Sequence, residues 1–235
     1  MRYLFFLFLL LFFIFASLNN AHAYTIQTLN YPGSTYTEPW GINDSGQIVG
    51  TYHDAVGYHG FLYDPTNGFQ TLDYPGASYT YLYGINDNGQ IVGMYHDFSY
   101  WGGYHGFLYD PTNGFQTLNY PGAAETYLYG INDSGQIVGT YYDYYYSGGG
   151  YHGFLYDPTN GFQILNYLGG YCTRFYDIND SGQIVGMYHD FSYWGGYHGL
   201  LINPDRSSNP VPEPTTVVLL AAGFGFLPFL KRKKH

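Results

Sequence analysis

The chain has 235 residues, of which 46% are hydrophobic and 22% aromatic, with 33 glycines and a single cysteine. Its formal net charge is −10, and between residues 24 and 230 two basic residues stand against seventeen acidic ones, which gives −15 for that stretch. Such a surface repels phosphates and anionic lipid headgroups, which argues against nucleic-acid binding and electrostatic membrane docking. One cysteine forms no intramolecular disulfide, so packing must stabilise the fold.

The first predicted element is an N-terminal leader. Arg2 precedes an unbroken apolar run over residues 3–16, and a polar stretch then ends in the small residues Ala21 and Ala23. This order is typical of a secretory signal peptide, so we expect signal peptidase to remove residues 1–23. A retained membrane anchor is the alternative, but the apolar run is shorter than the roughly 20 residues that span a bilayer core.

Four copies of one unit fill residues 24–206. Their most regular segment reads GINDSGQIVGTY, or a close variant, and starts at residues 41, 84, 130 and 177. A period of this size indicates a solenoid or a propeller, in which each unit is buried only by stacking on its neighbours. The eighteen residues 89–106 recur without substitution at 182–199, which duplication of a two-unit block explains.

The repeats are predicted to be all-β. In the second copy, β-branched and aromatic residues fill four runs, which are separated by glycine, asparagine, aspartate and proline. Both faces of the first run carry large apolar or aromatic residues, which suits a propeller blade covered by a neighbour on each side. The four predicted strands are 79–85, 90–96, 104–110 and 114–120.

The order of these runs predicts how the array ends. The segment YTIQTLNYPG, which starts at Tyr24, matches the fourth strand of the unit, whereas the last copy ends after its third strand. We therefore expect residues 26–31 to complete the blade formed by residues 173–202. A four-bladed β-propeller-like domain closed by its N- and C-terminal strands would have no exposed sheet edge. An open solenoid is the alternative, because counting strands does not show closure.

The repeats also resemble an extracellular repeat family called HAF, which has a similar Ile-Asn, Gly-Gln-Ile-Val-Gly and His-x-Phe-Leu series. The match covers nearly all of residues 24–204, although glycine replaces the usual alanine after each histidine and Leu200 replaces phenylalanine in the last copy. The resemblance implies an exported, propeller-like protein without an assigned chemistry. The relevant segments are 59–61, 105–107, 152–154 and 198–200.

Three consecutive signals make up the C-terminal tail. A linker, 207–214, ends in Val211-Pro212-Glu213-Pro214, where the prolines favour the extended backbone that a protease needs. The apolar stretch 215–230 would span about 24 Å as a helix, and the basic cluster 231–234 should remain on the cytoplasmic side. Residues 215–235 are therefore predicted to be a transmembrane helix with a basic tail.

This order resembles the PEP-CTERM sorting signal. The resemblance implies a Gram-negative bacterium, recognition of Pro212-Glu213-Pro214 by a membrane-embedded exosortase, and release or transfer to the cell surface or extracellular matrix. The inner membrane would then be a transient partner, and exopolysaccharide of a biofilm a lasting one. An unprocessed tail anchor is the alternative.

One repeated segment contains residue types that occur in catalytic and in metal-binding sites. Asp-Ser-Gly at 44–46, 133–135 and 180–182 is reminiscent of a nucleophilic serine, but the second copy has Asn88 in place of the serine and the tripeptide also serves as a hairpin turn. The same Asn-Asp-Ser segments can supply oxygen ligands for weak Ca²⁺ binding, although their spacing is not that of an EF-hand. We expect no catalytic residue, no enzyme activity, no cofactor and no dedicated metal site.

Histidines recur once per copy, at 59, 105, 152 and 198. They would ring the axis as metal ligands if the blades closed around them. A residue present in every copy is first a packing solution, however, so we favour the same local hydrogen bond in each blade.

Aromatic residues gather in the loops between the second and third strands of the later copies. Such a rim suits stacking on sugar rings or contact with partner proteins, but duplication alone also explains its repetition. The sequence thus predicts an exported, non-enzymatic surface or matrix protein, with a glycan-binding lectin-like module as the alternative and a hydrolase as the least favoured. The candidate rim residues are Phe98, Tyr100, Trp101, Tyr145, Phe191, Tyr193 and Trp194.

Overall fold

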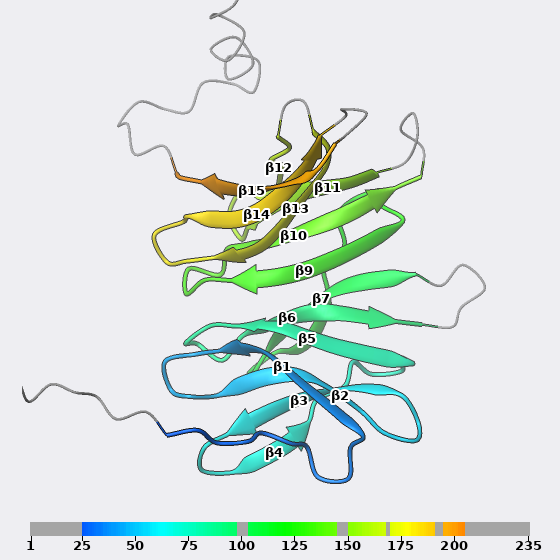
Figure 1. Ribbon diagram of the computed structural model, residues 1–235, viewed down its shortest axis with the longest axis vertical. Helices are drawn as coiled ribbons and strands as arrows, with labels where there is room; N and C mark the ends of the chain where they lie inside the picture. The colour runs from blue at the N-terminus through cyan, green and yellow to red at the C-terminus, as the bar shows by residue number, and fades with distance from the viewer. Residues whose placement is uncertain (1–24, 98–102, 145–149, 168–169, 191–194, 205–235) are drawn as a thin grey trace, which may run out of the picture.

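The structure, a computed structural model, describes residues 25–97, 103–144, 150–167, 170–190 and 195–204. These residues form four antiparallel sheets stacked one after another along the long axis of the molecule (Figure 1), and they contain no helix. We call the sheets blades 1 to 4. Together they form a four-bladed, propeller-like all-β array, as the sequence predicts.

Each blade is a meander whose strands pair in sequence order. The first three blades have four strands and the last has three. Blade 1 contains β1 (Tyr36–Ile42), β2 (Ile48–His53), β3 (Tyr58–Asp64) and β4 (Gly68–Thr71); blade 2 contains β5 (Tyr79–Ile85), β6 (Ile91–His96), β7 (Tyr104–Asp110) and β8 (Gly114–Thr117). Blade 3 contains β9 (Glu125–Ile131), β10 (Ile137–Asp143), β11 (Gly150–Asp157) and β12 (Gly161–Ile164); blade 4 contains β13 (Gly170–Ile178), β14 (Ile184–Asp190) and β15 (Tyr197–Ile202).

The predicted turns follow the chemistry of their residues. Between β7 and β8, the Asp110 carboxylate accepts hydrogen bonds from the backbone N–H groups of Thr112 and Asn113, at 2.9 and 3.0 Å. Gly114 then takes a φ of +76°, which a residue without Cβ adopts at no steric cost. The fourth strand ends at Thr117 rather than at residue 120, because the chain leaves the sheet there to reach the next blade.

Apolar side chains are buried between consecutive blades rather than within one. Between blades 1 and 2, Val49 and Leu72 of the first blade meet Leu82 and Ile85 of the second. Phe107 also belongs to this cluster and is fully buried. Equivalent clusters lie between blades 2 and 3 and between blades 3 and 4. Each sheet therefore depends on the next one for its burial.

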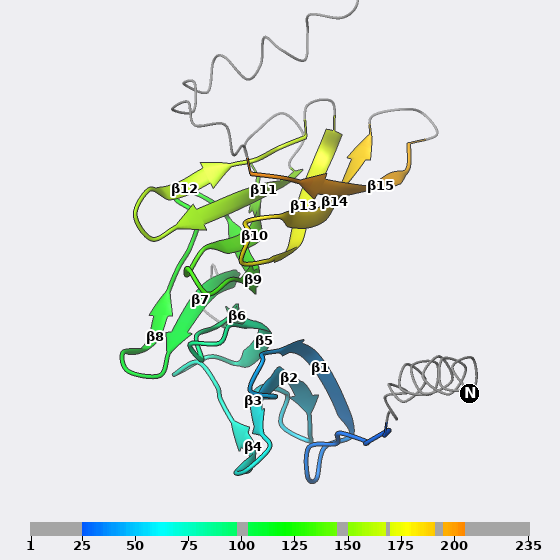
Figure 2. The ribbon, with the colours of Figure 1, turned by 90° about the vertical axis from the view of Figure 1, so that its left-hand side faces the viewer.

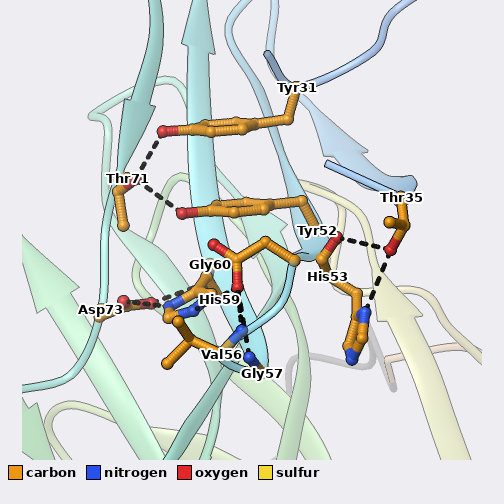
Figure 3. Close-up of polar contacts among 11 residues, drawn as sticks. Tyr31, Thr35, Tyr52, His53, Val56, Gly57, His59, Gly60, Thr71 and Asp73 are labelled. Atoms are coloured by element: carbon orange, nitrogen blue, oxygen red, sulfur yellow. Dashed lines mark hydrogen bonds and ion pairs between the residues drawn. The ribbon is translucent and has the colours of Figure 1, made fainter. Parts of the chain in front are cut away.

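A tyrosine after each fourth strand fastens one blade to the next. Tyr74 stacks on Tyr95 with ring centroids 3.8 Å apart, and its N–H donates to the Thr80 hydroxyl at 3.0 Å. The same arrangement occurs at the N-terminus, where Tyr31 stacks on Tyr52 at 3.7 Å (Figure 3). Residues 31–34 are thus held against blade 1 although no blade precedes it.

The predicted closure of the ring by the chain's own ends is wrong for this structure. In the described part of the chain, blade 4 has three strands and residues 25–30 form none. Figures 1 and 2 place the N-terminal segment and β15 at opposite ends of the stack. The physical reason is that Tyr31 is held against blade 1 by its stack on Tyr52 and its hydrogen bond to Thr37, so the residues before it start at the end of the stack opposite to β15.

Glycine in each second strand permits the close fit inside a blade. A Cβ on Gly139 would lie 2.2 Å from the Tyr127 carbonyl oxygen and 2.7 Å from the Phe154 ring. We expect Gly139→Ala to lower the free energy of unfolding by about 1–3 kcal/mol through overpacking. Gly196→Ala is the control, because the nearest atom to its Cβ would lie 3.9 Å away and its φ is not in the left-handed region. Urea unfolding of both variants checks this, and equal losses would contradict it.

Candidate functional site

The first strand of each blade faces the inner side of the array. Just before the Gly-Ile-Asn-Asp segment of each repeat, or Asp-Ile-Asn-Asp in the fourth, stands one aromatic residue. A β-bulge between Pro39 and Gly41 sets the local register in blade 1, and equivalent shifts occur in the other blades. We call these four residues the axial aromatic row: Trp40, Tyr83, Tyr129 and Tyr176.

Neighbouring rings of the axial aromatic row contact one another from blade to blade. The centroids of Trp40 and Tyr83 are 5.5 Å apart at 80°, and those of Tyr83 and Tyr129 are 5.1 Å apart at 48°. Tyr129 and Tyr176 follow at 6.1 Å and 65°. These tilted and edge-to-face geometries are the preferred ones for aromatic pairs. A cavity of about 610 Å³ lies against the row, and the glycines and isoleucines beside it complete its wall.

The row is neutral at physiological pH. Burial raises the pKa of Tyr83, and it raises that of Tyr129 to about 12 even though the Arg174 charge opposes the shift. Phenol groups with such values remain protonated and act as hydrogen-bond donors and acceptors. The two end members, Trp40 and Tyr176, are 52% and 43% exposed, so their rings are available to a ligand.

A second row lies two residues earlier on the same strands and consists of Glu38, Tyr81, Tyr127 and Arg174. Burial raises the pKa of Tyr81 to about 12. Arg174 lies over the Tyr151 ring, 4.0 Å from its centroid, which is a cation–π contact. It is the only basic residue between positions 24 and 204. The inner side therefore carries an acidic residue at blade 1 and a basic one at blade 4.

The Asn-Asp segments form a ladder at one end of the inner side. Asp44 N–H donates to Asp87 Oδ1 at 2.8 Å, and Asp87 N–H donates to Asp133 Oδ1 at 2.9 Å. Asp133 N–H continues to Asp180 at 2.9 Å. Carboxylates engaged in this way serve to join blades. Within the described ranges, no group of three or more His, Cys, Asp or Glu side chains converges as a metal site.

The Asp-Ser-Gly tripeptides are hairpin turns in this structure. Gly46 N–H donates to Asn43 O at 3.0 Å, and the Ser45 hydroxyl donates to the Asn43 side chain at 3.2 Å. Ser181 contacts Asn179 in the same way, at 2.8 Å. Both hydroxyls are thus directed into their own turns.

Three of the four repeated histidines make the local contact that the sequence predicts. His59 Nδ1 lies 2.7 Å from Asp73 Oδ2 (Figure 3). His105 and His152 each lie 3.0 Å from an asparagine at the matching position. His198 Nε2 lies 3.1 Å from Asp190, as His59 Nε2 lies 3.5 Å from the equivalent Asp54. The contact to Nδ1 is not present for His198, because the described part of blade 4 has no fourth strand to supply it.

The axial aromatic row was missed as a site at the sequence level. Its signal in the sequence is a large aromatic residue directly before Gly41 and before the equivalent residue of every other copy, a pattern that strand packing alone also explains. All seven predicted rim residues lie outside the described residues, as do the cleavage site at Ala21 and Ala23 and the sorting motif 211–214. Among the residues that the structure describes, no helix is long and apolar enough to cross a membrane. The predicted span 215–230 lies outside them.

Comparison with known proteins gives two similarities. A family model described as "Protein of unknown function (DUF3466)" matches residues 69–174. A solved structure described as "Streptogramin B lyase structure" is 15% identical with a TM-score of 0.40, and the match covers 73% of this chain and 56% of that one. The chain thus spans little more than half of that protein, and we draw neither a reaction nor a substrate from this likeness. No curated protein matches the chain.

Asp177 stands where the other copies have glycine and lines the same cavity. Desolvation raises the pKa of its carboxyl above the ordinary value of 3.8, so the fold disfavours the charged form. Asp177→Asn should therefore raise the melting temperature at pH 7. The gain should vanish below pH 3.8, because the wild-type carboxyl is protonated in both folded and unfolded states there.

Thermal melts between pH 3 and pH 8 check this, with Asp44→Asn as the control because Asp44 is exposed. An equal gain for Asp177→Asn at pH 3 and pH 7 would contradict the electrostatic cause.

Proposed function

We propose that this protein is an exported, non-enzymatic component of the cell surface or extracellular matrix, and that it binds a neutral glycan on its inner side. The observation that carries the glycan proposal is the axial aromatic row beside its cavity of about 610 Å³. Apolar faces of sugar rings stack on aromatic side chains, and the phenol hydroxyls at their edges hydrogen-bond to sugar hydroxyls.

The electrostatics of the chain support a neutral ligand over a charged one. The formal charge of −15 between residues 24 and 230 opposes phosphate and uronate groups. The row itself carries no charge at neutral pH, since burial raises the pKa of Tyr83 and Tyr129. A polysaccharide with a repeating unit also suits this site, because each of the four blades contributes one aromatic ring to it.

Export and sorting form the second half of the proposal. The leader 1–23 supports translocation by the secretory route, and the tail supports processing by an exosortase at Pro212-Glu213-Pro214. Sorting would deliver the repeat domain to the surface or matrix, where exopolysaccharide is the glycan at hand. Weak Ca²⁺ binding by the Asn-Asp-Ser segments stays a minor proposal.

Removal of the exposed rings tests the glycan site. Trp40→Ala with Tyr176→Ala should weaken binding of the source organism's neutral polysaccharide about tenfold, or ~1.4 kcal/mol, as measured by isothermal titration calorimetry. Ile164→Ala is the control, because it removes an exposed apolar side chain from the opposite edge, on β12. Unchanged binding in the double variant would refute the inner-side site.

The predicted rim gives a separate arm of this experiment. If binding falls only in Trp101→Ala with Trp194→Ala, the glycan site is the loop rim rather than the axial aromatic row. Absence of binding by the wild-type protein would leave a purely structural role.

Alanine substitution of Pro212, Glu213 and Pro214 tests sorting. The variant should accumulate in the membrane with an uncleaved tail, because the recognition motif is lost. Immunoblotting of membrane and extracellular fractions, with and without the exosortase, measures this. The same size and location for variant and wild type would refute exosortase sorting and leave the glycan proposal untouched.

A further inference from the structure

The two ends of the blade stack expose opposite halves of one repeated interface. Val49, Val92 and Val138 are fully buried because the next blade covers them, whereas the equivalent Val185 in blade 4 is 46% exposed. At the other end, Ile42 of blade 1 is 67% exposed, and its equivalents in the later blades are buried. Among the described residues, no blade follows blade 4 and none precedes blade 1.

Blade 4 also lacks a strand that the sequence supplies elsewhere. In blades 1 to 3, a fourth strand covers a glycine of the third strand, so that a Cβ on Gly106 would lie 2.7 Å from the Leu118 carbonyl oxygen. A Cβ on the equivalent Gly199 would meet nothing within 4 Å. The edge of β15 is therefore unpaired among the described residues and retains the shape that accepts a strand.

The segment 25–30 has the sequence of that missing strand. Thr25-Ile-Gln-Thr-Leu-Asn30 aligns with Gly68-Phe-Gln-Thr-Leu-Asp73 of blade 1. Asp73 accepts a hydrogen bond from Gly60 N–H at 2.9 Å and contacts His59, and Asn119 does the same for Gly106 and His105. Asn30 is the residue of this segment that is equivalent to Asp73 and Asn119. In blade 4 no described strand supplies such a side chain to Gly199 N–H and His198 Nδ1.

Tyr31 positions residues 25–30 relative to blade 1. It stacks on Tyr52 and donates its N–H to Thr37 Oγ1 at 3.0 Å, as Tyr74 does toward Tyr95 and Thr80 (Figure 3). In the inner repeats, the residues just before this tyrosine belong to the preceding blade. Residues 25–30 are thus anchored at the position from which they would pair with a blade packed on the open face of blade 1. Ile26, at 98% exposure, has no cover in the single chain.

We propose that blade 4 of one copy packs on blade 1 of a second copy, with residues 25–29 of the second copy forming the missing fourth strand beside β15. Two copies that do this reciprocally close a ring of eight blades, which falls within the usual range of about four to eight for propellers.

A second copy is the occupant because the interface it would form already occurs three times inside the chain. The sheet face of blade 1 that carries Ile42 is equivalent to the faces that blades 2, 3 and 4 bury against the preceding blade. The sheet face of blade 4 that carries Val185 is equivalent to the faces that blades 1, 2 and 3 bury against the following blade. The pairing would also place Arg174 of one copy and Glu38 of the other at equivalent positions of neighbouring first strands, as residues of opposite charge.

The same pairing would place Tyr176 of one copy against Trp40 of the other, as Trp40 lies against Tyr83 inside the chain. The experiments below therefore use no glycan and no substitution in the axial aromatic row, so that their failure is distinguishable from failure of the glycan proposal.

A disulfide trap tests the pairing directly. In the existing blades Leu62 pairs with Gln70, and Leu108 with Gln116, so the proposal pairs Leu201 with Gln27 of the second copy. Antiparallel partners have Cα atoms about 4.5–5.5 Å apart, which a disulfide bridges. The full chain, kept in mild detergent, would carry Gln27→Cys and Leu201→Cys together with Cys172→Ser.

We expect a covalent dimer on a non-reducing denaturing gel, and a cross-linked pair when copies with only Gln27→Cys are mixed with copies with only Leu201→Cys. An internally bridged monomer would show that the chain closes on itself and would overturn the proposal. A ladder of longer oligomers would overturn the two-copy ring, and absence of any bridge would overturn the pairing.

A second measurement uses charge in the pairing segment. Leu29→Asp should raise the dissociation constant of the dimer more than tenfold in sedimentation experiments, because Leu72, its equivalent, is buried between blades. Gln27→Asp is the matched control, since its equivalent Gln70 is exposed. Equal effects of the two variants, or a monomeric wild type, would overturn the proposal.

Discussion

The packing of one sheet face against the next is the constraint on which the rest of the structure depends. The clusters around Phe107, Phe154 and Phe175 all lie across a boundary between blades, whereas in blade 1 Phe61 is buried beneath Tyr31 and Phe69. Turns, tyrosine stacks and the Asn-Asp ladder hold neighbouring sheets at the distance that this packing requires. Cooperative stacking of this kind makes stability a property of the array rather than of one unit.

The eighteen residues that occur twice illustrate the same constraint. In blade 2 they contain β6 and the start of β7, and in blade 4 the same residues contain β14 and the start of β15. Val92 and Val185 are the same position of this segment, yet one is fully buried and the other is half exposed. Identical local sequence gives identical strands, whereas burial is decided by whether another sheet follows.

Repetition also builds the inner side. One aromatic residue in a single blade forms no binding site. When the four blades stack, these residues form a contiguous row beside a cavity: Trp40, Tyr83, Tyr129 and Tyr176. Burial within this row raises the pKa of its phenol groups and keeps them neutral. The chemistry of the site is therefore that of stacking and hydrogen bonding.

The sequence by itself determined the repeat, its strands and its turns, because alternation of apolar residues and the preferences of Gly, Asn, Asp and Pro act over a few neighbouring positions. It also predicted a shared local hydrogen bond for the repeated histidines but not its partner, and three of the four make it, for example His59 with Asp73 just beyond β4. It did not determine whether the array closes, because the angle between sheets is set by side chains that meet only after stacking. For the same reason the axial aromatic row could not be identified from the spacing of its members, which are 43 to 47 residues apart. Only the tertiary structure brought these rings together and left the faces of blade 1 and blade 4 uncovered.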